Sequence, residues 1–245
     1  MDHAGAVAGP LAAAALLAAG WSVREVILWT IVPGVLSVLL VAMLREPEGL
    51  AVGNGKIDWQ WQSLPAPLKR YLVALGVFTL SQASNMFLLL RAKETGFTDT
   101  QIPLLWAGFS ALAMLLSTPL SALSDRVDRR SLLCGAWVVY ALLFAAFGLL
   151  PSRVGTTIAL FVGYAIFIAA TEGAEKALIA ELAPQAQLGT AFGWFHLVSG
   201  VMLLPASALF GWLWSHAGST TAFMVSASTS FIAAGLLLRA RRAER

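Results

Sequence analysis

Long apolar runs alternate with short polar or charged stretches along the whole sequence. Each run approaches the roughly 20 apolar residues that cross a bilayer core of about 30 Å as an α-helix. The pattern predicts eight membrane helices, at residues 4–20, 26–44, 71–90, 103–123, 131–150, 157–179, 189–214 and 219–238. Because an even number of crossings returns the chain to its starting side, we expect both termini on the same side of the membrane.

The composition indicates the class of protein to which these helices belong. Hydrophobic residues make up 58% of the chain and charged residues 12%, which leaves more apolar surface than one soluble core can bury. We therefore expect an all-α polytopic membrane protein. The first residues do not resemble a secretory signal, because Asp2 and His3 replace the basic n-region. The net charge of +3 is small and gives no indication of a nucleic-acid partner.

The positions of the Lys and Arg residues predict which side the termini occupy. If both termini are cytoplasmic, four of the 16 Lys and Arg residues fall on the outer side, namely Arg24, Arg91, Lys93 and Arg153. An excess of positive charge on the inner side is the usual bias of membrane proteins. We therefore expect a multi-pass protein in membrane lipid, with both termini in the cytoplasm.

The longest polar segment, residues 46–69, is rich in Pro and Gly and is predicted to be a cytoplasmic linker. It divides the chain into two helices within residues 1–45 and six helices within residues 70–245. Trp59 and Trp61 alternate with polar neighbours, which suits indoles lying in the headgroup region. A Trp pair packed on the helical bundle is an equal alternative.

A weak internal repeat relates the two ends of the chain. A shift of 195 residues places Gly5 on Gly200 and Pro10 on Pro205. In both copies a polar break and a second apolar helix follow. The shared layout favours a real repeat, in which the first two helices correspond to the last two.

A densely charged turn, Leu-Ser-Asp-Arg-Val-Asp-Arg-Arg at residues 123–130, separates two of the predicted helices. It resembles the Gly-x-x-x-Asp-Arg-x-Gly-Arg-Arg signature of transporters of the major facilitator superfamily, with Ser121 and Asp128 at the two glycine positions. The resemblance implies a helical bundle of that type and, with the repeat, places the turn between the family's eighth and ninth helices. Residues 1–45 then match the family's fifth and sixth helices, residues 70–245 match its C-terminal half, and four N-terminal helices are missing.

The resemblance also implies roles for the charged residues. The first carboxylate of the turn is expected to dock at the N-terminus of a neighbouring helix, near residues 189–192, and the arginines are expected to pair with Glu175 or Glu181 on the adjacent helix. The cytoplasmic gating residues expected on this basis are Asp125, Arg126, Arg129, Arg130, Lys176 and Glu181. The alternative is a solvated turn that only follows the positive-inside rule.

The first helix carries a pattern of small residues. The sequence Gly5-x3-Gly9-Pro10-x2-Ala13-Ala14 resembles the Gly-x3-Gly-Pro-x2-Gly-Gly pattern on the fifth helix of drug/proton antiporters in this superfamily. The resemblance implies proton antiport. Small residues at four-residue spacing equally predict a helix-packing face with no bearing on antiport.

Polar residues inside the apolar span 71–90 are candidates for a transport cavity, because such groups are costly in hydrocarbon. Gln82 and Asn85 lie three residues apart and share one helix face, and Ser84 lies beside them. This predicts a polar strip toward a water-filled cavity. Hydrogen bonding between helices is an equal alternative.

Two acids lie in the inner part of the predicted helix 157–179. Glu172 and Glu175 are candidates for cavity carboxylates that bind a proton or gate the cavity. Glu172 also lies four residues before Lys176, so an ion pair that anchors the helix end is the alternative.

The resemblance implies secondary active transport of a small solute across a bacterial inner membrane by alternating access, with proton-coupled efflux as the narrower hypothesis. The alternative is a truncated, non-transporting membrane scaffold that packs with a partner, for example the missing N-terminal helices as a separate chain. An enzyme is not expected, because the sequence has neither a serine nucleophile elbow nor a metalloprotease signature. The three His residues show no metal-ligand spacing, so no metal or other cofactor is expected.

Overall fold

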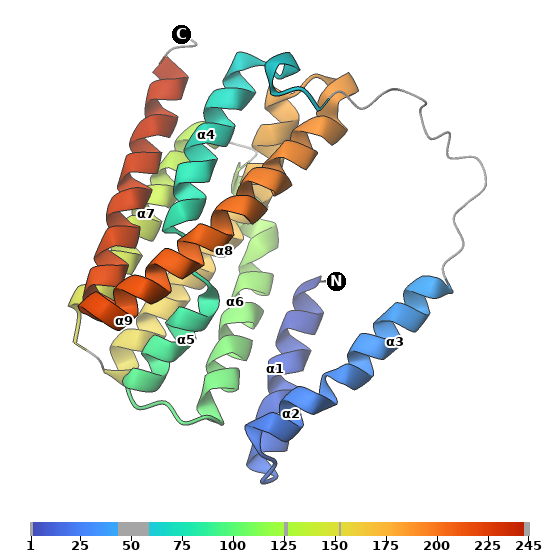
Figure 1. Ribbon diagram of the computed structural model, residues 1–245, viewed down its shortest axis with the longest axis vertical. Coiled ribbons are helices and arrows are strands. Elements are labelled where there is room, and N and C mark those ends of the chain that lie inside the picture. Colours follow the sequence, from blue (N-terminus) through green and yellow to red (C-terminus); the bar gives the residue numbers. More distant parts are fainter. Residues whose placement is uncertain (1, 44–58, 125–126, 152, 243–245) are drawn as a thin grey trace.

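The computed structural model describes residues 2–43, 59–124, 127–151 and 153–242. These residues form a bundle of α-helices with two short 3-10 turns (Figure 1), and no strand occurs among them. The elements are α1 (Asp2–Ala18), α2 (Val23–Trp29), α3 (Ile31–Ala42), η1 (Trp61–Ser63), α4 (Ala66–Ser81), α5 (Asn85–Glu94), α6 (Gln101–Ser124), α7 (Arg129–Leu149), α8 (Val154–Leu182), η2 (Gln185–Gln187) and α9 (Leu188–Arg242). The predicted all-α class is confirmed.

Six helical stretches of the described chain are long and apolar enough to cross a membrane. They are Val23–Ala42, Ala66–Glu94, Gln101–Ala122, Arg129–Leu149, Val154–Leu182 and Gln185–Ala240. The last is 56 residues long and folds back on itself at Gly218, whose φ of 85° lies in the left-handed region that glycine tolerates. It therefore contains both helices predicted at 189–214 and 219–238, and the multi-pass architecture is confirmed.

Two predicted helices are interrupted in the structure. The apolar run 71–90 divides into α4 and α5, because the chain leaves the helix at Gln82 and Ser84 starts a new one by accepting from the Met86 backbone N–H at 3.3 Å. The run 26–44 divides at Thr30 into α2 and α3. Neither break follows from the apolar pattern, since both halves of each run remain apolar.

α4 begins at Ala66, inside the segment predicted as linker. This start has a local cause. Pro67 lies in the first turn of the helix, where backbone N–H groups have no intrahelical acceptor, so the N–H that proline lacks costs no hydrogen bond. Within the predicted linker, residues 59–65 are also described and contain η1, whereas residues 46–58 lie outside the described residues.

The core lies among α4, α7, α8 and α9 and is rich in aromatic side chains. Phe78 of α4 stacks on Trp137 of α7 with ring centroids 4.4 Å apart, and Tyr140 stacks on Phe144 at 4.0 Å. All four side chains are almost completely buried. Aromatic packing of this kind holds the polar groups of neighbouring residues in fixed positions inside the bundle.

The first three helices relate differently to the bundle. α1 packs along α6, with Ala14 buried at 4% exposure. α2 and α3 bury no residue; α2 lies against the end of α1, and α3 stands apart from the bundle in Figure 1. The close helix approach expected at Gly5, Gly9 and Gly200 is not made within the described chain, because a Cβ atom at any of them would meet no atom within 4 Å. Pro10 and Pro205 of the same expected motif lie inside α1 and α9.

Candidate functional site

The bundle has two chemically different ends. One, here called the basic end, holds the start of α4, the start of α7, the C-terminal end of α8 and the last turns of α9, and it carries Lys69, Arg70, Arg129, Arg130 and Arg239. The opposite end holds the α5–α6, α7–α8 and Gly218 turns.

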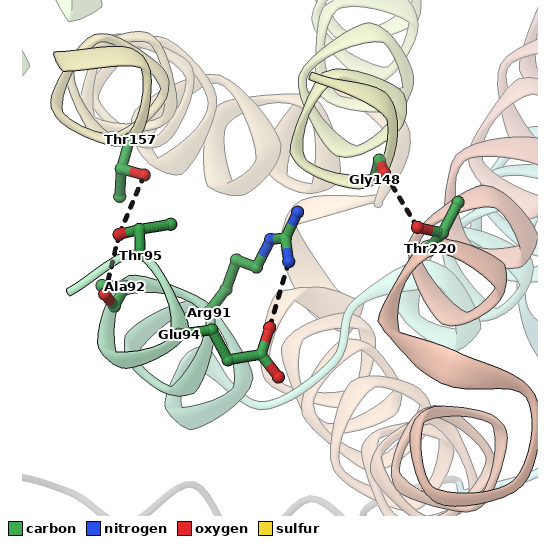
Figure 2. A network of polar contacts seen from close by, with 7 residues as sticks. All are labelled: Arg91, Ala92, Glu94, Thr95, Gly148, Thr157 and Thr220. Atoms are coloured by element: carbon green, nitrogen blue, oxygen red, sulfur yellow. Dashed lines mark hydrogen bonds and ion pairs between the residues drawn. The ribbon is translucent and has the colours of Figure 1, made fainter. Parts of the chain in front are cut away.

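Side chains close the opposite end by tying helices to one another (Figure 2). Thr157 of α8 donates to the Thr95 hydroxyl at 3.3 Å, and Thr220 of α9 donates to the carbonyl of Gly148 at the end of α7 at 3.0 Å. Gly148 lets α7 and α9 approach closely there, because a Cβ atom on it would lie 3.0 Å from the Cβ of Phe223. These contacts join α5 to α8 and α7 to α9.

The break between α4 and α5 is held from the core side. Tyr140 donates to the Ser81 carbonyl at 3.0 Å, and Ser226 of α9 donates to the same oxygen. Tyr164 of α8 donates to the Asn85 side-chain oxygen at 2.9 Å. Helices α7, α8 and α9 therefore all contact the interruption, which makes it a junction of the bundle.

The three polar residues predicted for a cavity thus gather at this junction. Gln82 is half-buried at the end of α4, Ser84 caps α5, and Asn85 is held by Tyr164. Asn85 makes the interhelical hydrogen bond of the alternative interpretation. The Ser84 hydroxyl accepts from the Met86 backbone N–H and so caps its own helix, α5.

Glu175 lies on the inner side of α8, where it is half-buried. Two buried donors converge on its carboxylate from other helices. The Trp137 indole N–H of α7 and the Tyr71 hydroxyl of α4 both lie close enough to the carboxylate to interact with it electrostatically, without forming a hydrogen bond. Tyr71 is 2% exposed and Trp137 is 0% exposed, and neither donor has a hydrogen-bond partner in the described chain.

Glu172 lies on the exposed side of the same helix and pairs with Lys176 at 3.1 Å. The two line a pocket of about 230 Å³ between α6 and α8, together with Ser117, Ser121 and Gly173. The Oγ atom of Ser121 lies 2.7 Å from the place where a Cβ on Gly173 would be, so a glycine at this position lets α6 and α8 approach closely. The structure thus places Glu175 half-buried on the inner side of α8 and Glu172 in the pocket between α6 and α8.

The charged turn is described only in part. Asp125 and Arg126 lie outside the described residues, as does any docking of Asp125 near residues 189–192. Asp128 caps α7 by accepting from the Ser131 backbone N–H at 3.0 Å, which gives the residue at the signature's second glycine position a structural use. Arg129 pairs with Glu181 at the end of α8 at 3.1 Å.

Among the other expected gating residues, Lys176 pairs with Glu172 on its own helix, and Arg130 is half-buried at the start of α7. The structure therefore brings Arg129 and Glu181 together at the basic end and assigns Lys176 to the pocket between α6 and α8.

The Trp pair before α4 packs on the bundle. The Trp61 ring lies 5.0 Å from that of Trp194 on α9, edge to face. Trp59 lies against Gly193, where a Cβ would be 2.9 Å from its ring. Trp61 therefore follows the packed alternative, whereas Trp59 contacts the bundle and remains 53% exposed.

Sequence reasoning missed the aromatic partners of the site. Tyr71, Trp137, Tyr140 and Tyr164 were not singled out, because aromatic residues are common in membrane helices. A usable signal does exist, since Tyr and Trp carry a polar group that needs a partner when it is buried. Their presence deep inside apolar runs predicts polar contacts there.

Comparison with known proteins decides the family. The model of the Major Facilitator Superfamily matches residues 70–245. The chain belongs to the Major Facilitator Superfamily. It is also 32% identical, over 246 aligned residues, to a protein of Methanocaldococcus jannaschii described as an uncharacterised MFS-type transporter. The alignment covers 97% of this chain and 61% of that relative, so the chain spans about three fifths of the length of the relative it matches. No solved structure matches the chain.

As a superfamily member, the chain is a multi-pass helical membrane protein related to transporters. The predicted resemblance is confirmed at the level of the superfamily and of its C-terminal portion. The charged turn, the α4–α5 junction and the group of Glu175, Tyr71 and Trp137, here called the Glu175 cluster, all lie within the matched region.

Proposed function

We propose that this chain forms part of a secondary transporter that moves a small solute across a bacterial inner membrane by alternating access, coupled to protons. Residues 1–45 supply the last two helices of an N-terminal half, residues 46–69 the linker and residues 70–245 the C-terminal half. Superfamily membership and the six membrane-spanning stretches support the transporter. The gathering of cations at the basic end supports the orientation, with this end and both termini in the cytoplasm.

The observation that carries the coupling proposal is the convergence of Tyr71 and Trp137 on Glu175. A buried donor without an acceptor costs about 1–3 kcal/mol. An ionised Glu175 accepts from both donors after a small approach of the helices, whereas a protonated Glu175 accepts less well. The charge state of one carboxyl group therefore changes how tightly α4, α7 and α8 are held together.

The described side chains that act on Glu175 lie on α4, α7 and α8. Tyr71 approaches it from α4, and Trp137, which does not titrate, approaches it from α7. On its own helix, Glu172 and Lys176 act on it with opposite signs and form a pair with each other. The pair largely cancels itself, so that Glu175 remains the group whose protonation changes the local charge.

The solute path is proposed to run past the polar residues at the junction and in the pocket between α6 and α8. Gln82 lies half-buried at the helix break, and Ser117, Ser121 and Glu172 line the pocket. Breaks in membrane helices are tolerated where they line a cavity or are satisfied by neighbours, and binding sites in this kind of transporter are built from them. Arg129 and Glu181 are proposed as a gate at the basic end, which must separate when that end opens.

A second candidate function is a non-transporting membrane scaffold that packs with a partner. The observation that favours it is the absence of any buried residue in α2 and α3, although both helices are apolar. Further membrane helices, from a separate chain or from the same protein, would cover them. Under the transport proposal the same helices complete the N-terminal half.

A flux assay separates the two functions. The full-length gene product is placed in proteoliposomes, and uptake of a broad panel of radiolabelled small solutes is measured with and without a pH gradient. Secondary transport predicts gradient-dependent flux of at least one solute class. Flux that never exceeds that of protein-free liposomes, with correctly folded protein in the bilayer, would favour the scaffold.

A further inference from the structure

A basic pocket lies at the membrane boundary of the bundle, away from the α4–α5 junction and the Glu175 cluster. It has a volume of about 470 Å³ and lies between the first turns of α4, the last turns of α9 and η1. Lys69, Arg70 and Arg239 supply its charge, and Trp61, Val73 and Leu236 supply its apolar wall.

The positive charge of this pocket has no counterpart in the described chain. Lys69 donates to the carbonyl of Gln62 at 2.8 Å, which fixes its ammonium group at the mouth of the pocket. Arg70 and Arg239 are exposed, and neither pairs with an acid among the described residues. No described carboxylate lines the pocket. Three like charges gathered in this way repel one another unless an anion lies between them.

The apolar wall lies where the membrane begins. The spanning stretch that contains α4 starts at Ala66, and the one that contains α9 ends at Ala240, so the cations lie at the level of the headgroups. Val73, one helical turn beyond Lys69 within the spanning stretch of α4, is 54% exposed and lines the pocket. Trp61 is held in place against Trp194. The pocket therefore offers a charged mouth above an apolar groove.

We propose that this pocket binds an anionic phospholipid of the phosphatidylglycerol type. The phosphate lies among Lys69, Arg70 and Arg239, and an acyl chain follows the groove past Val73 and Leu236. Basic pockets between membrane helices on the cytoplasmic side recognise anionic headgroups in this way. The bound lipid connects α4, α9 and the segment before α4. Among the described residues, no charged pair connects these three parts at the basic end. The site is independent of the transport proposal.

Binding is measured on the purified full chain by native mass spectrometry, with phosphatidylglycerol and phosphatidylcholine of identical acyl chains. The test variant is Arg70→Gln/Arg239→Gln, which leaves Lys69 and its bond to Gln62 intact. The matched control is Arg24→Gln/Arg153→Gln, which removes the same charge from exposed positions elsewhere. Circular dichroism and gel filtration verify that both variants fold as the unmodified chain does.

We expect the unmodified chain to prefer phosphatidylglycerol, and the test variant to bind it about 25-fold more weakly, at roughly fivefold per cation removed. The control should change this affinity less than twofold. The proposal is overturned if the two lipids bind equally, or if the control loses as much affinity as the test variant. It is also overturned if inorganic phosphate alone displaces the lipid at equal concentration, because the site would then recognise a free anion and not a lipid.

Discussion

The carbonyl oxygen of Ser81 offers a sharp test of how the helix break is held. Tyr140 and Ser226 both donate to this oxygen, from α7 and α9. Tyr140→Phe and Ser226→Ala each leave the oxygen one donor, so each should cost only one buried hydrogen bond, about 1 kcal/mol. The double variant leaves a buried carbonyl without a side-chain donor, which adds a desolvation penalty of about 1–3 kcal/mol. The two substitutions should therefore be non-additive by at least about 1 kcal/mol.

The assay is reversible unfolding in mixed detergent and sodium dodecyl sulfate micelles, followed by circular dichroism for the four members of the cycle. A matched cycle pairs Tyr164→Phe with Ser226→Ala. Because Tyr164 donates to the Asn85 side chain and not to Ser81, this second cycle should be additive within about 0.5 kcal/mol. Additive values in the Ser81 cycle would refute the reasoning, since they would mean that the two donors do not share one acceptor.

Two further predictions concern the packing and capping of the helices. Gly173→Ala should destabilise the fold by about 1–3 kcal/mol, because its Cβ would lie 2.7 Å from the Ser121 hydroxyl oxygen. Ser121→Ala removes that oxygen and keeps a Cβ at an ordinary 3.5 Å, so it should restore most of the loss in the same unfolding assay, and failure of the rescue would place the strain elsewhere. Asp128→Ala should lower the free energy of unfolding by about 1 kcal/mol, because it removes the N-cap of α7, whereas Asp128→Asn keeps a capping oxygen and should lower it much less. Equal losses of stability would show that Asp128 contributes through its charge and not through the cap.

The helices were predictable because the bilayer restricts the chain to spans of apolar residues. The predicted segments at 103–123, 131–150 and 157–179 became α6, α7 and α8 with shifts of a few residues. The two helices predicted around Gly218 also form. The family followed from the charged turn, whose spacing is distinctive although both of its glycines are replaced.

The interruptions and the site could not be predicted in the same way. The break after Ser81 depends on donors from α7 and α9, which lie 59 and 145 residues away in sequence. Nothing in the local sequence encodes these partners. The same holds for Glu175, because the convergence of Tyr71 and Trp137 on it requires three packed helices. The sequence made Glu172 and Glu175 equal candidates for a cavity carboxylate. Only the packing of the helices distinguishes Glu172, which lines the pocket, from the half-buried Glu175.

The most direct test of proton coupling compares two conservative variants of these acids in proteoliposomes. Glu175→Gln and Glu172→Gln each remove one carboxylate from α8, and the second serves as the matched control. For a solute that the unmodified full-length protein transports, both pH-driven accumulation and gradient-free exchange are measured. We predict that Glu175→Gln loses accumulation but keeps exchange. Glu172→Gln, which alters the lining of the proposed solute path, changes accumulation and exchange by the same factor and so keeps the coupling. Accumulation by Glu175→Gln equal to that of the unmodified protein would contradict the assignment of Glu175 as the proton site.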